Sequence, residues 1–241
     1  MAELVVYEDL WSKELICGNV DRGPDHILIA GRTGAGKSTI MNNLIYSVLC
    51  APSGEHSMVL IDPKVLEFDP YHGVPHEIWY AETYEQIVDV LRKCYLFVNK
   101  RFESLRGTGK KLFEGTRVHI FIDELMVIMT GANDGRAKKY LQQILTLARA
   151  ANVQVIMATQ CPKANIIPTE IKANCGVIIG LQTRSGQDSR NIIGVKGCEN
   201  LPRVGKALVQ DPDNQEPHVV ELHKVAEEHI EELVAWRLDG N

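Results

Sequence analysis

The stretch HILIAGRTGAGKSTIMNNL, residues 26–44, combines a short apolar run, a glycine-rich turn and the start of a helical pattern. Its centre, GRTGAGKS, has the spacing G-x-x-x-x-G-K-S, and this order of strand, glycine loop and helix is the context that a P-loop requires. Gly31, Gly34 and Gly36 can adopt backbone angles closed to other residues, so that successive N–H groups converge on an anion at the start of the helix. The stretch therefore predicts phosphate binding. The alternative is a glycine-rich turn that merely joins a strand to a helix.

The same spacing assigns roles to single side chains. Lys37 is expected to reach the β- and γ-phosphates of ATP, and the hydroxyl of Ser38 is expected to bind Mg²⁺. The residues predicted to bind the nucleotide are Gly31, Arg32, Thr33, Gly34, Ala35, Gly36, Lys37, Ser38 and Thr39.

A second motif is HIFIDEL, residues 119–125, in which an apolar strand ends in two carboxylates. Asp123 has the position of a Walker B aspartate, which faces the Mg²⁺ ion held by Ser38. Glu124 follows directly and is suited to polarise a water molecule for attack on the γ-phosphate, which favours a hydrolase over a small-molecule kinase. The alternative is a polar strand end that starts the next loop. The pair predicts ATP hydrolysis.

A third element is VIMATQ, residues 155–160, where an apolar strand ends in Thr159 and Gln160. If this strand lies near the P-loop strand, Gln160 can sense the γ-phosphate and pass the nucleotide state to the loop that follows. A plain structural cap of the strand end explains these two residues equally well.

Composition limits the class of protein. The chain has 241 residues, of which 45% are hydrophobic and 24% charged, enough for one sizeable core. We expect one domain, with an N-terminal lead-in over 1–24, a core over 25–210 and a C-terminal strand and helix over 211–241. The net charge of −5 argues against a uniformly basic surface, although a local basic loop remains compatible with it. Six cysteines without a C-x-x-C pair predict reduced thiols and no zinc site. Short apolar runs and an acidic N-terminus predict a cytoplasmic protein that does not insert into membranes.

Apolar strands alternate with helical patterns along the chain, which predicts an α/β fold: a mainly parallel sheet with helices on both faces. One helix, at about 83–105, has its core face marked by apolar residues at steps of three and four. Strands are expected at 26–31, 58–62, 118–124, 153–160 and 176–182, and helices at 37–49, 83–105, 135–151 and 227–238.

Six segments of the chain, in the same order, resemble the FtsK/SpoIIIE-type DNA translocases, which are RecA-like hexameric motors. They are HILIAGRTGAGKS, LIDPKVLEFDPYHGVPH, FIDELMVIM, ILTLARAANVQVIMATQCP, IPTEIKANCGVIIGLQTRSGQDSRNIIG and LPRVGKALV. The resemblance implies a RecA-like P-loop NTPase that forms a homo-oligomeric ring, with a hexamer as the expected form, and moves double-stranded DNA.

The resemblance also implies roles for further residues. Arg149 corresponds to a finger that reaches the γ-phosphate of a neighbouring subunit; the alternative is an arginine on a solvated helix end. Lys172 and Arg190 correspond to positions in two loops that line the pore and contact DNA phosphates, with ordinary surface charge as the alternative.

The chain departs from the family where two further phosphate contacts are expected. Cys161 replaces the usual arginine of TQRP, and Gly186 replaces a lysine that precedes DSR. Lys163 and Arg184 lie close enough in sequence to substitute for them as DNA contacts. Fewer contacts imply a weaker grip and a shallower salt dependence.

The chain is also shorter than the usual family member, which suggests a minimal motor. Such a unit suits a mobile element, phage or plasmid, in which partner proteins supply membrane attachment or DNA choice. Two other hypotheses remain: a protein-export or assembly ATPase of the same superfamily, and a nucleotide-gated adaptor with little turnover, against which Glu124 argues.

Overall fold

The computed structural model describes residues 10–17, 23–52, 54–131, 135–214 and 216–240. Within these ranges the strands form one eight-stranded sheet in the order β3-β2-β4-β5-β1-β6-β7-β8. Neighbouring strands from β3 to β6 are parallel, whereas β7 is antiparallel to β6 and β8 to β7. The expected fold class, a mainly parallel sheet, is confirmed. The strands are β1 His26–Ala30, β2 His56–Ile61, β3 Glu77–Ala81, β4 Arg117–Ile122, β5 Val153–Thr159, β6 Cys175–Gly180, β7 Lys206–Gln210 and β8 His218–Glu221.

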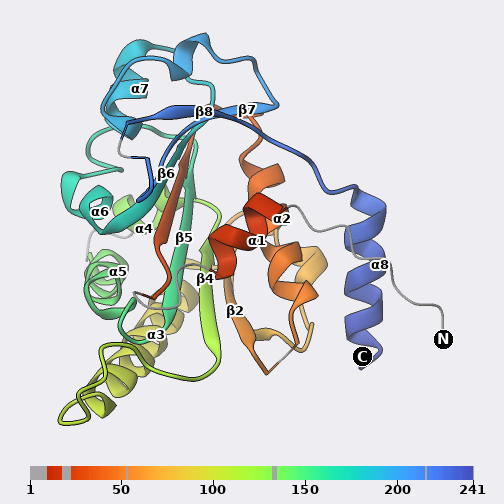
Figure 1. The fold of residues 1–241 in the computed structure, drawn as a ribbon, viewed down its shortest axis with the longest axis vertical. Coiled ribbons are helices and arrows are strands. Elements are labelled where there is room, and N and C mark those ends of the chain that lie inside the picture. Colours follow the sequence, from red (N-terminus) through yellow and green to blue (C-terminus); the bar gives the residue numbers. More distant parts are fainter. Residues whose placement is uncertain (1–9, 18–22, 53, 132–134, 215, 241) are drawn as a thin grey trace.

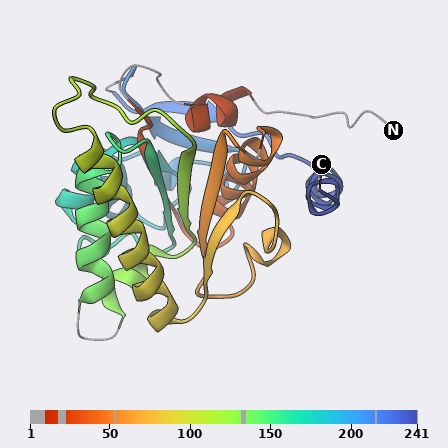
Figure 2. The same ribbon diagram turned by 90° about the horizontal axis from the view of Figure 1, so that it is seen from below.

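Helices cover both faces of this sheet, as expected (Figure 1). Seen from below, α3 and α5 lie on one face, and α2, with α8 packed outside it, lies on the other (Figure 2). The α-helices are α1 Leu10–Cys17, α2 Lys37–Cys50, α3 Tyr84–Ser104, α4 Leu125–Thr130, α5 Arg136–Leu147, α6 Thr169–Asn174, α7 Gly186–Ile193 and α8 Glu227–Leu238, and two 3-10 turns are η1 Asp69–Tyr71 and η2 Cys198–Asn200. Of the N-terminal lead-in, residues 1–9 and 18–22 lie outside the described ranges.

The core has two layers because each central strand is buried on both faces, as parallel strands require. In β1, Leu28 belongs to the layer under α3 and α5, whereas Ile27 and Ile29 belong to the layer under α2. The face of α3 predicted from its periodicity is buried against the sheet, and it consists of Ile87, Val90, Leu91, Cys94 and Val98. A capping box of Thr83 and Gln86 fixes the start of this helix.

The sequence pattern missed several short elements. β3, α4, α6, α7 and β7 were not predicted, and the strand expected at 118–124 ends at Ile122. Glu124 is instead the N-cap of α4, and its side chain accepts a hydrogen bond from the Met126 backbone N–H. Both carboxylates therefore lie just beyond the strand, at its carboxyl end. Among the described residues no helix has the length and apolar character needed to cross a membrane.

Candidate functional site

The glycine-rich turn leads from β1 into α2. Gly34 and Gly36 have φ angles of 72° and 100°, in the left-handed region that residues with a Cβ rarely adopt. Gly31 is different, because its φ is not positive, and a Cβ there would lie 2.6 Å from the Leu181 Cβ just after β6. The backbone-angle argument for Gly31 was therefore wrong; close packing is what requires glycine at this position.

Lys37 is the first residue of α2, and its ammonium folds back over the loop. Nζ donates hydrogen bonds to the carbonyl oxygens of Gly31 at 2.9 Å and Arg32 at 3.0 Å. Burial lowers the pKa of Lys37, although the charge of Glu124 acts in the opposite direction. No side chain among the described residues caps the helix start at Gly36, so the first N–H groups of α2 are available for an anion.

Arg203 is a second cation at this loop, and sequence reasoning did not single it out. A Cβ built on Gly34 would lie 3.0 Å from Arg203 Nη2, so the guanidinium covers the middle of the turn. Arg203 is exposed, and it lies in the segment between η2 and β7. Lys37 and Arg203 thus place an ammonium and a permanently charged guanidinium beside the turn.

The two carboxylates follow β4, which β5 separates from β1. Glu124 is only 1% exposed, and its Oε1 accepts a hydrogen bond from Thr159 Oγ1 at 2.7 Å. Asp123 is also buried, and burial raises its pKa against the opposing hydrogen bond and charge of Lys64. The structure therefore brings Asp123 and Glu124 together at the carboxyl edge of the sheet, with Glu124 fixed by the end of the neighbouring strand.

Two residues that follow β2 complete this cluster. Lys64 Nζ lies 3.0 Å from Asp123 Oδ2 and 3.4 Å from Glu124 Oε2, and Ser38 Oγ donates a hydrogen bond of 2.7 Å to Glu67 Oε1. Burial would lower the pKa of Lys64, but its hydrogen bonds and ion pairs with the two carboxylates outweigh burial and raise it. Neither Lys64 nor Glu67 was predicted as a site residue, although both lie in the segment LIDPKVLEF that resembles the family. The signal that could have identified them is that these polar residues directly follow a buried strand, at the edge where ligands bind in such sheets.

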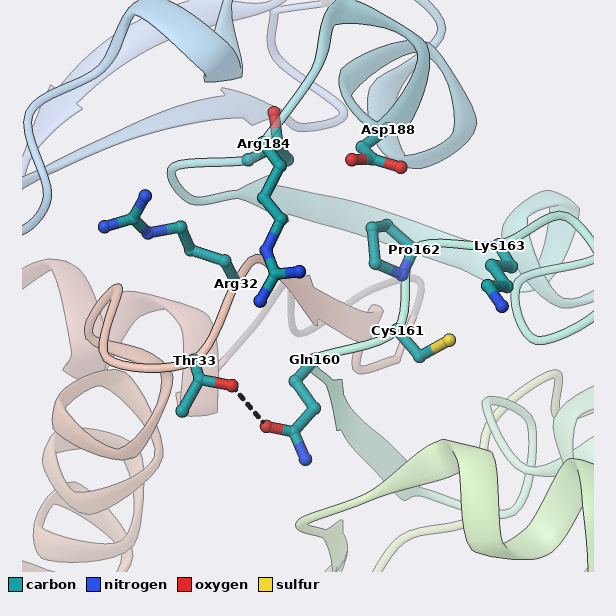
Figure 3. Close-up of a pocket in the computed structure, with 9 residues that line it drawn as sticks. Arg32, Thr33, Gln160, Cys161, Pro162, Lys163, Arg184 and Asp188 are labelled. Atoms are coloured by element: carbon teal, nitrogen blue, oxygen red, sulfur yellow. Dashed lines mark hydrogen bonds between the residues drawn. The ribbon is translucent and has the colours of Figure 1, made fainter.

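The strand that ends in Thr159 and Gln160, β5, pairs with the P-loop strand β1, which is the condition stated for Gln160, and its end contacts both motifs. Besides the bond from Thr159 to Glu124, Thr33 Oγ1 donates to Gln160 Oε1 at 2.7 Å. Gln160 and Thr33 border a pocket of about 390 Å³, in which Arg184 extends toward Arg32 and Gln160 (Figure 3). The pocket is lined by Arg32, Thr33, Gln160, Cys161, Pro162, Lys163, Thr183, Arg184 and Asp188.

The four residues expected to contact DNA do not share one environment. Lys163 and Arg184 line the pocket beside the P-loop. Arg190 is exposed on α7, and its Nη2 donates to Gln187 Oε1 of the same helix at 3.0 Å. Lys172 donates through Nζ to the Asn191 carbonyl oxygen at 3.0 Å, and this bond joins α6 to the last turn of α7. The ammonium of Lys172 thus has a structural partner within the chain.

Arg149 lies at the amino ends of the strands, opposite the end that carries the P-loop. It follows α5, and its Nη2 lies 3.1 Å from Oδ1 of Asp25, the residue before β1. Asp25 and the P-loop are at the two ends of β1, roughly 20 Å apart at the rise of an extended strand. The side chain, 42% exposed, is therefore out of reach of the nucleotide site of its own chain.

The FtsK/SpoIIIE family model matches residues 3–196. The chain belongs to the FtsK/SpoIIIE family. This confirms the resemblance carried by the six segments. One family member, the DNA translocase FtsK of Caldanaerobacter subterraneus subsp. tengcongensis, is 32% identical over 221 residues, which are 87% of this chain and 31% of that protein. The chain thus spans about a third of the length of the curated relatives that it matches.

Two solved structures share the P-loop ATPase fold. The pCW3 conjugation coupling protein TcpA, in its monomer form with ATPγS, has a TM-score of 0.75 and 22% identity over 88% of this chain and 65% of that one. The cytoplasmic domain of the Type VII secretion ATPase EccC of Thermomonospora curvata has a TM-score of 0.70 and 21% identity over 91% of this chain and 28% of that one. These similarities are of fold alone.

Proposed function

We propose that residues 1–241 form one RecA-like ATPase domain that hydrolyses ATP and, as a ring of identical subunits, moves double-stranded DNA. The observation that carries the proposal is that both motifs meet at the segment after β2: Ser38 of the P-loop donates to Glu67, and Lys64 pairs with the buried carboxylates Asp123 and Glu124. The intact Glu124, held by Thr159, argues against an adaptor that binds ATP without turnover.

The P-loop residues 31–39 would bind the phosphates of ATP through backbone N–H groups, with Lys37 supplying positive charge. The site offers the Ser38 hydroxyl and the Asp123 carboxylate, and these oxygen donors fit Mg²⁺. Proteins usually bind this ion through one or two carboxylates together with substrate phosphates, and not through a full set of protein ligands. Ser38 and Asp123 would hold the ion, and when bound it would neutralise charge that develops on the phosphates.

Glu124 is suited to orient the attacking water and accept its proton, because Thr159 fixes one of its oxygens. Gln160 accepts a hydrogen bond from Thr33 of the P-loop. A ligand that binds the loop would disturb this hydrogen bond and shift the conformation of the segment that follows β5. Nucleotide state would in this way reach Lys163 in the same pocket.

A ring is proposed from the position of Arg149. Because this side chain cannot reach its own P-loop, a role at the γ-phosphate is open to it only at the site of a neighbouring subunit. Closed rings arise when such head-to-tail contacts repeat around an axis. We expect six subunits, and we expect the ion pair with Asp25 to hold the finger in place.

DNA is proposed as the polymer because the curated relatives at about 30% identity are DNA translocases. Lys163, Arg184 and Arg190, with Lys172, would contact phosphates. A polypeptide substrate is the second candidate, since Lys172 is committed to Asn191 and Cys161 stands where the family has an arginine. The setting in a mobile element, with partner proteins for membrane attachment or DNA choice, stays a prediction, as does a cytoplasmic location.

The test is ATP hydrolysis with and without duplex DNA at low salt. DNA is expected to stimulate turnover; Lys37→Ala should abolish nucleotide binding, and Glu124→Gln should bind ATP but hydrolyse it slowly. Glu231→Gln, an exposed site on α8, is the matched control and should behave as the wild type. Stimulation by an unfolded polypeptide but not by DNA would favour the second candidate, and a Glu124→Gln variant that hydrolyses at the wild-type rate would refute the assigned base.

A further inference from the structure

The segment from Asp62 to Phe68, here the 62–68 loop, is anchored at both ends. Asp62 is fully buried, and its carboxylate accepts backbone hydrogen bonds from Lys64 at 3.2 Å, Leu66 at 3.0 Å, and Glu67 and Phe68 at 2.9 Å. Phe68 is buried and packs edge-on against Phe121 of β4. One carboxylate thus fixes the backbone that presents the side chains of Lys64 and Glu67.

The tip of this loop is exposed and carries local strain. Val65 has a φ of 54°, a left-handed conformation that is unfavourable for a β-branched residue. Leu66 is 73% exposed, whereas its backbone N–H is held by the buried Asp62 carboxylate. A strained backbone persists only where the surrounding contacts over-determine it; here these are the four bonds to the Asp62 carboxylate and the bond of 3.2 Å from the Val65 N–H to the Asp62 carbonyl oxygen.

The loop contacts both protein groups that the proposed Mg²⁺ site uses. The Lys64 ammonium is 3.0 Å from Asp123 Oδ2, and Glu67 accepts the hydroxyl hydrogen of Ser38 at 2.7 Å. These two contacts differ in their consequence for a metal ion. A hydroxyl that donates to Glu67 keeps its lone pairs for the metal, whereas a carboxylate oxygen bonded to an ammonium must give up that bond or share it.

We propose that the 62–68 loop maintains the magnesium site before the metal arrives: Lys64 is a stand-in cation that Mg²⁺ must displace from Asp123, and Glu67 orients the Ser38 hydroxyl for coordination. This inference rests on the proposed function. Without Lys64, the two buried carboxylates would lose the ammonium that contacts both of them, which is unfavourable in a poorly solvated site. Lys64 therefore compensates the charge of the two carboxylates and competes with Mg²⁺ for Asp123.

The two residues are expected to have opposite effects on metal affinity. Removing the charge in Lys64→Met should lower the Mg²⁺ concentration at the midpoint of binding about tenfold, since the metal no longer breaks an ammonium–carboxylate bond. Glu67→Ala removes an outer partner of a metal-binding hydroxyl and should raise the midpoint about 10- to 100-fold. General damage to the site would instead shift both midpoints in the same direction.

The experiment titrates Mg²⁺ against a fluorescent, non-hydrolysable ATP analogue at fixed concentration, so turnover does not enter the measurement. Lys64→Arg keeps the positive charge and should stay within about threefold of the wild type, while Lys64→Gln offers a second neutral variant if Lys64→Met does not fold. Lys93→Met removes a lysine that pairs with Asp89 at 2.8 Å on the surface, and it should leave the midpoint unchanged.

A midpoint that is unchanged or raised in folded Lys64→Met and Lys64→Gln overturns the role of Lys64, and an unchanged midpoint in Glu67→Ala overturns that of Glu67. The wild type separates this inference from the proposed function. If the wild type shows no Mg²⁺-dependent nucleotide binding, the proposed function fails; if it binds and the variants do not shift, only the present inference fails.

Discussion

Acid is expected to destabilise the protein through a histidine at the start of the P-loop strand. His26 is fully buried, and its Nδ1 accepts a hydrogen bond from the Val155 backbone N–H at 3.1 Å, so this nitrogen is unprotonated in the fold. Burial, assisted by the nearby charge of Arg149, lowers the pKa of His26 from 6.5 to about 4. A proton on Nδ1 would abolish the bond that joins His26 of β1 to the neighbouring strand β5.

The direction and size follow from the difference between folded and unfolded states. The unfolded chain takes up this proton below pH 6.5, but the folded chain does so only near pH 4. The stability is therefore complete above the unfolded pKa and is lost as the pH falls between these two values. At about 1.4 kcal/mol per pKa unit, the loss from His26 is about 2 kcal/mol at about pH 5, and about 3.4 kcal/mol once the pH is below both values.

The assay compares the wild type with His26→Asn by urea unfolding at about pH 7.5 and about pH 5. The asparagine Oδ1 can accept the Val155 N–H but does not titrate. On acidification, the free energy of unfolding of the wild type should fall by about 2 kcal/mol more than that of His26→Asn. His56 and His119, whose pKa values are also lowered by burial, titrate in both proteins, so their effects cancel in the difference. A difference that stays constant over this pH range would refute the reasoning.

Four further predictions concern arginine and lysine side chains. Arg237→Ala should lower the free energy of unfolding, measured by urea melts, by about 3 kcal/mol. The buried guanidinium donates two hydrogen bonds, of 2.6 and 2.8 Å, to the Leu49 carbonyl oxygen and so joins α8 to the end of α2. A loss of stability near zero would contradict this prediction. Arg149→Ala subunits mixed with wild type should reduce ATPase activity more than in proportion to their fraction, and a proportional loss would argue against a finger acting between subunits. Arg190→Ala should flatten the slope of log affinity against log salt by roughly 0.9 per contact removed while the melting temperature stays unchanged. Lys172→Ala should flatten the salt slope and also lower the melting temperature, since its bond to α7 is lost. If the variant that combines Lys172→Ala with Arg190→Ala folds and keeps the wild-type DNA affinity and salt slope, neither residue contacts DNA.

The elements predicted correctly are those whose signals lie in consecutive residues. The spacing GRTGAGKS requires only eight neighbouring positions, and the apolar runs before Gly31 and Asp123 identify two strands that end at functional residues. The periodicity over 83–105 was sufficient to identify both α3 and the face that it buries. By contrast, β3, α6 and α7 are short and lack a long periodic pattern, so local propensity alone could not identify them.

Which of these residues meet depends on how the strands pair in the folded protein. Ser38 and Glu67 are 29 positions apart and Thr33 and Gln160 are 127 apart, and no spacing rule joins such pairs. Their contacts follow from the strand order, which places β5 between β1 and β4 and brings the end of β2 to the same edge. The same order puts Arg149 at the far edge and engages Lys172 with α7. The strand order is selected by the packing of helices on both faces of the sheet. A side chain's neighbours across the sheet depend on which strands pair and not on how far apart those strands lie in sequence, so local patterns do not predict them.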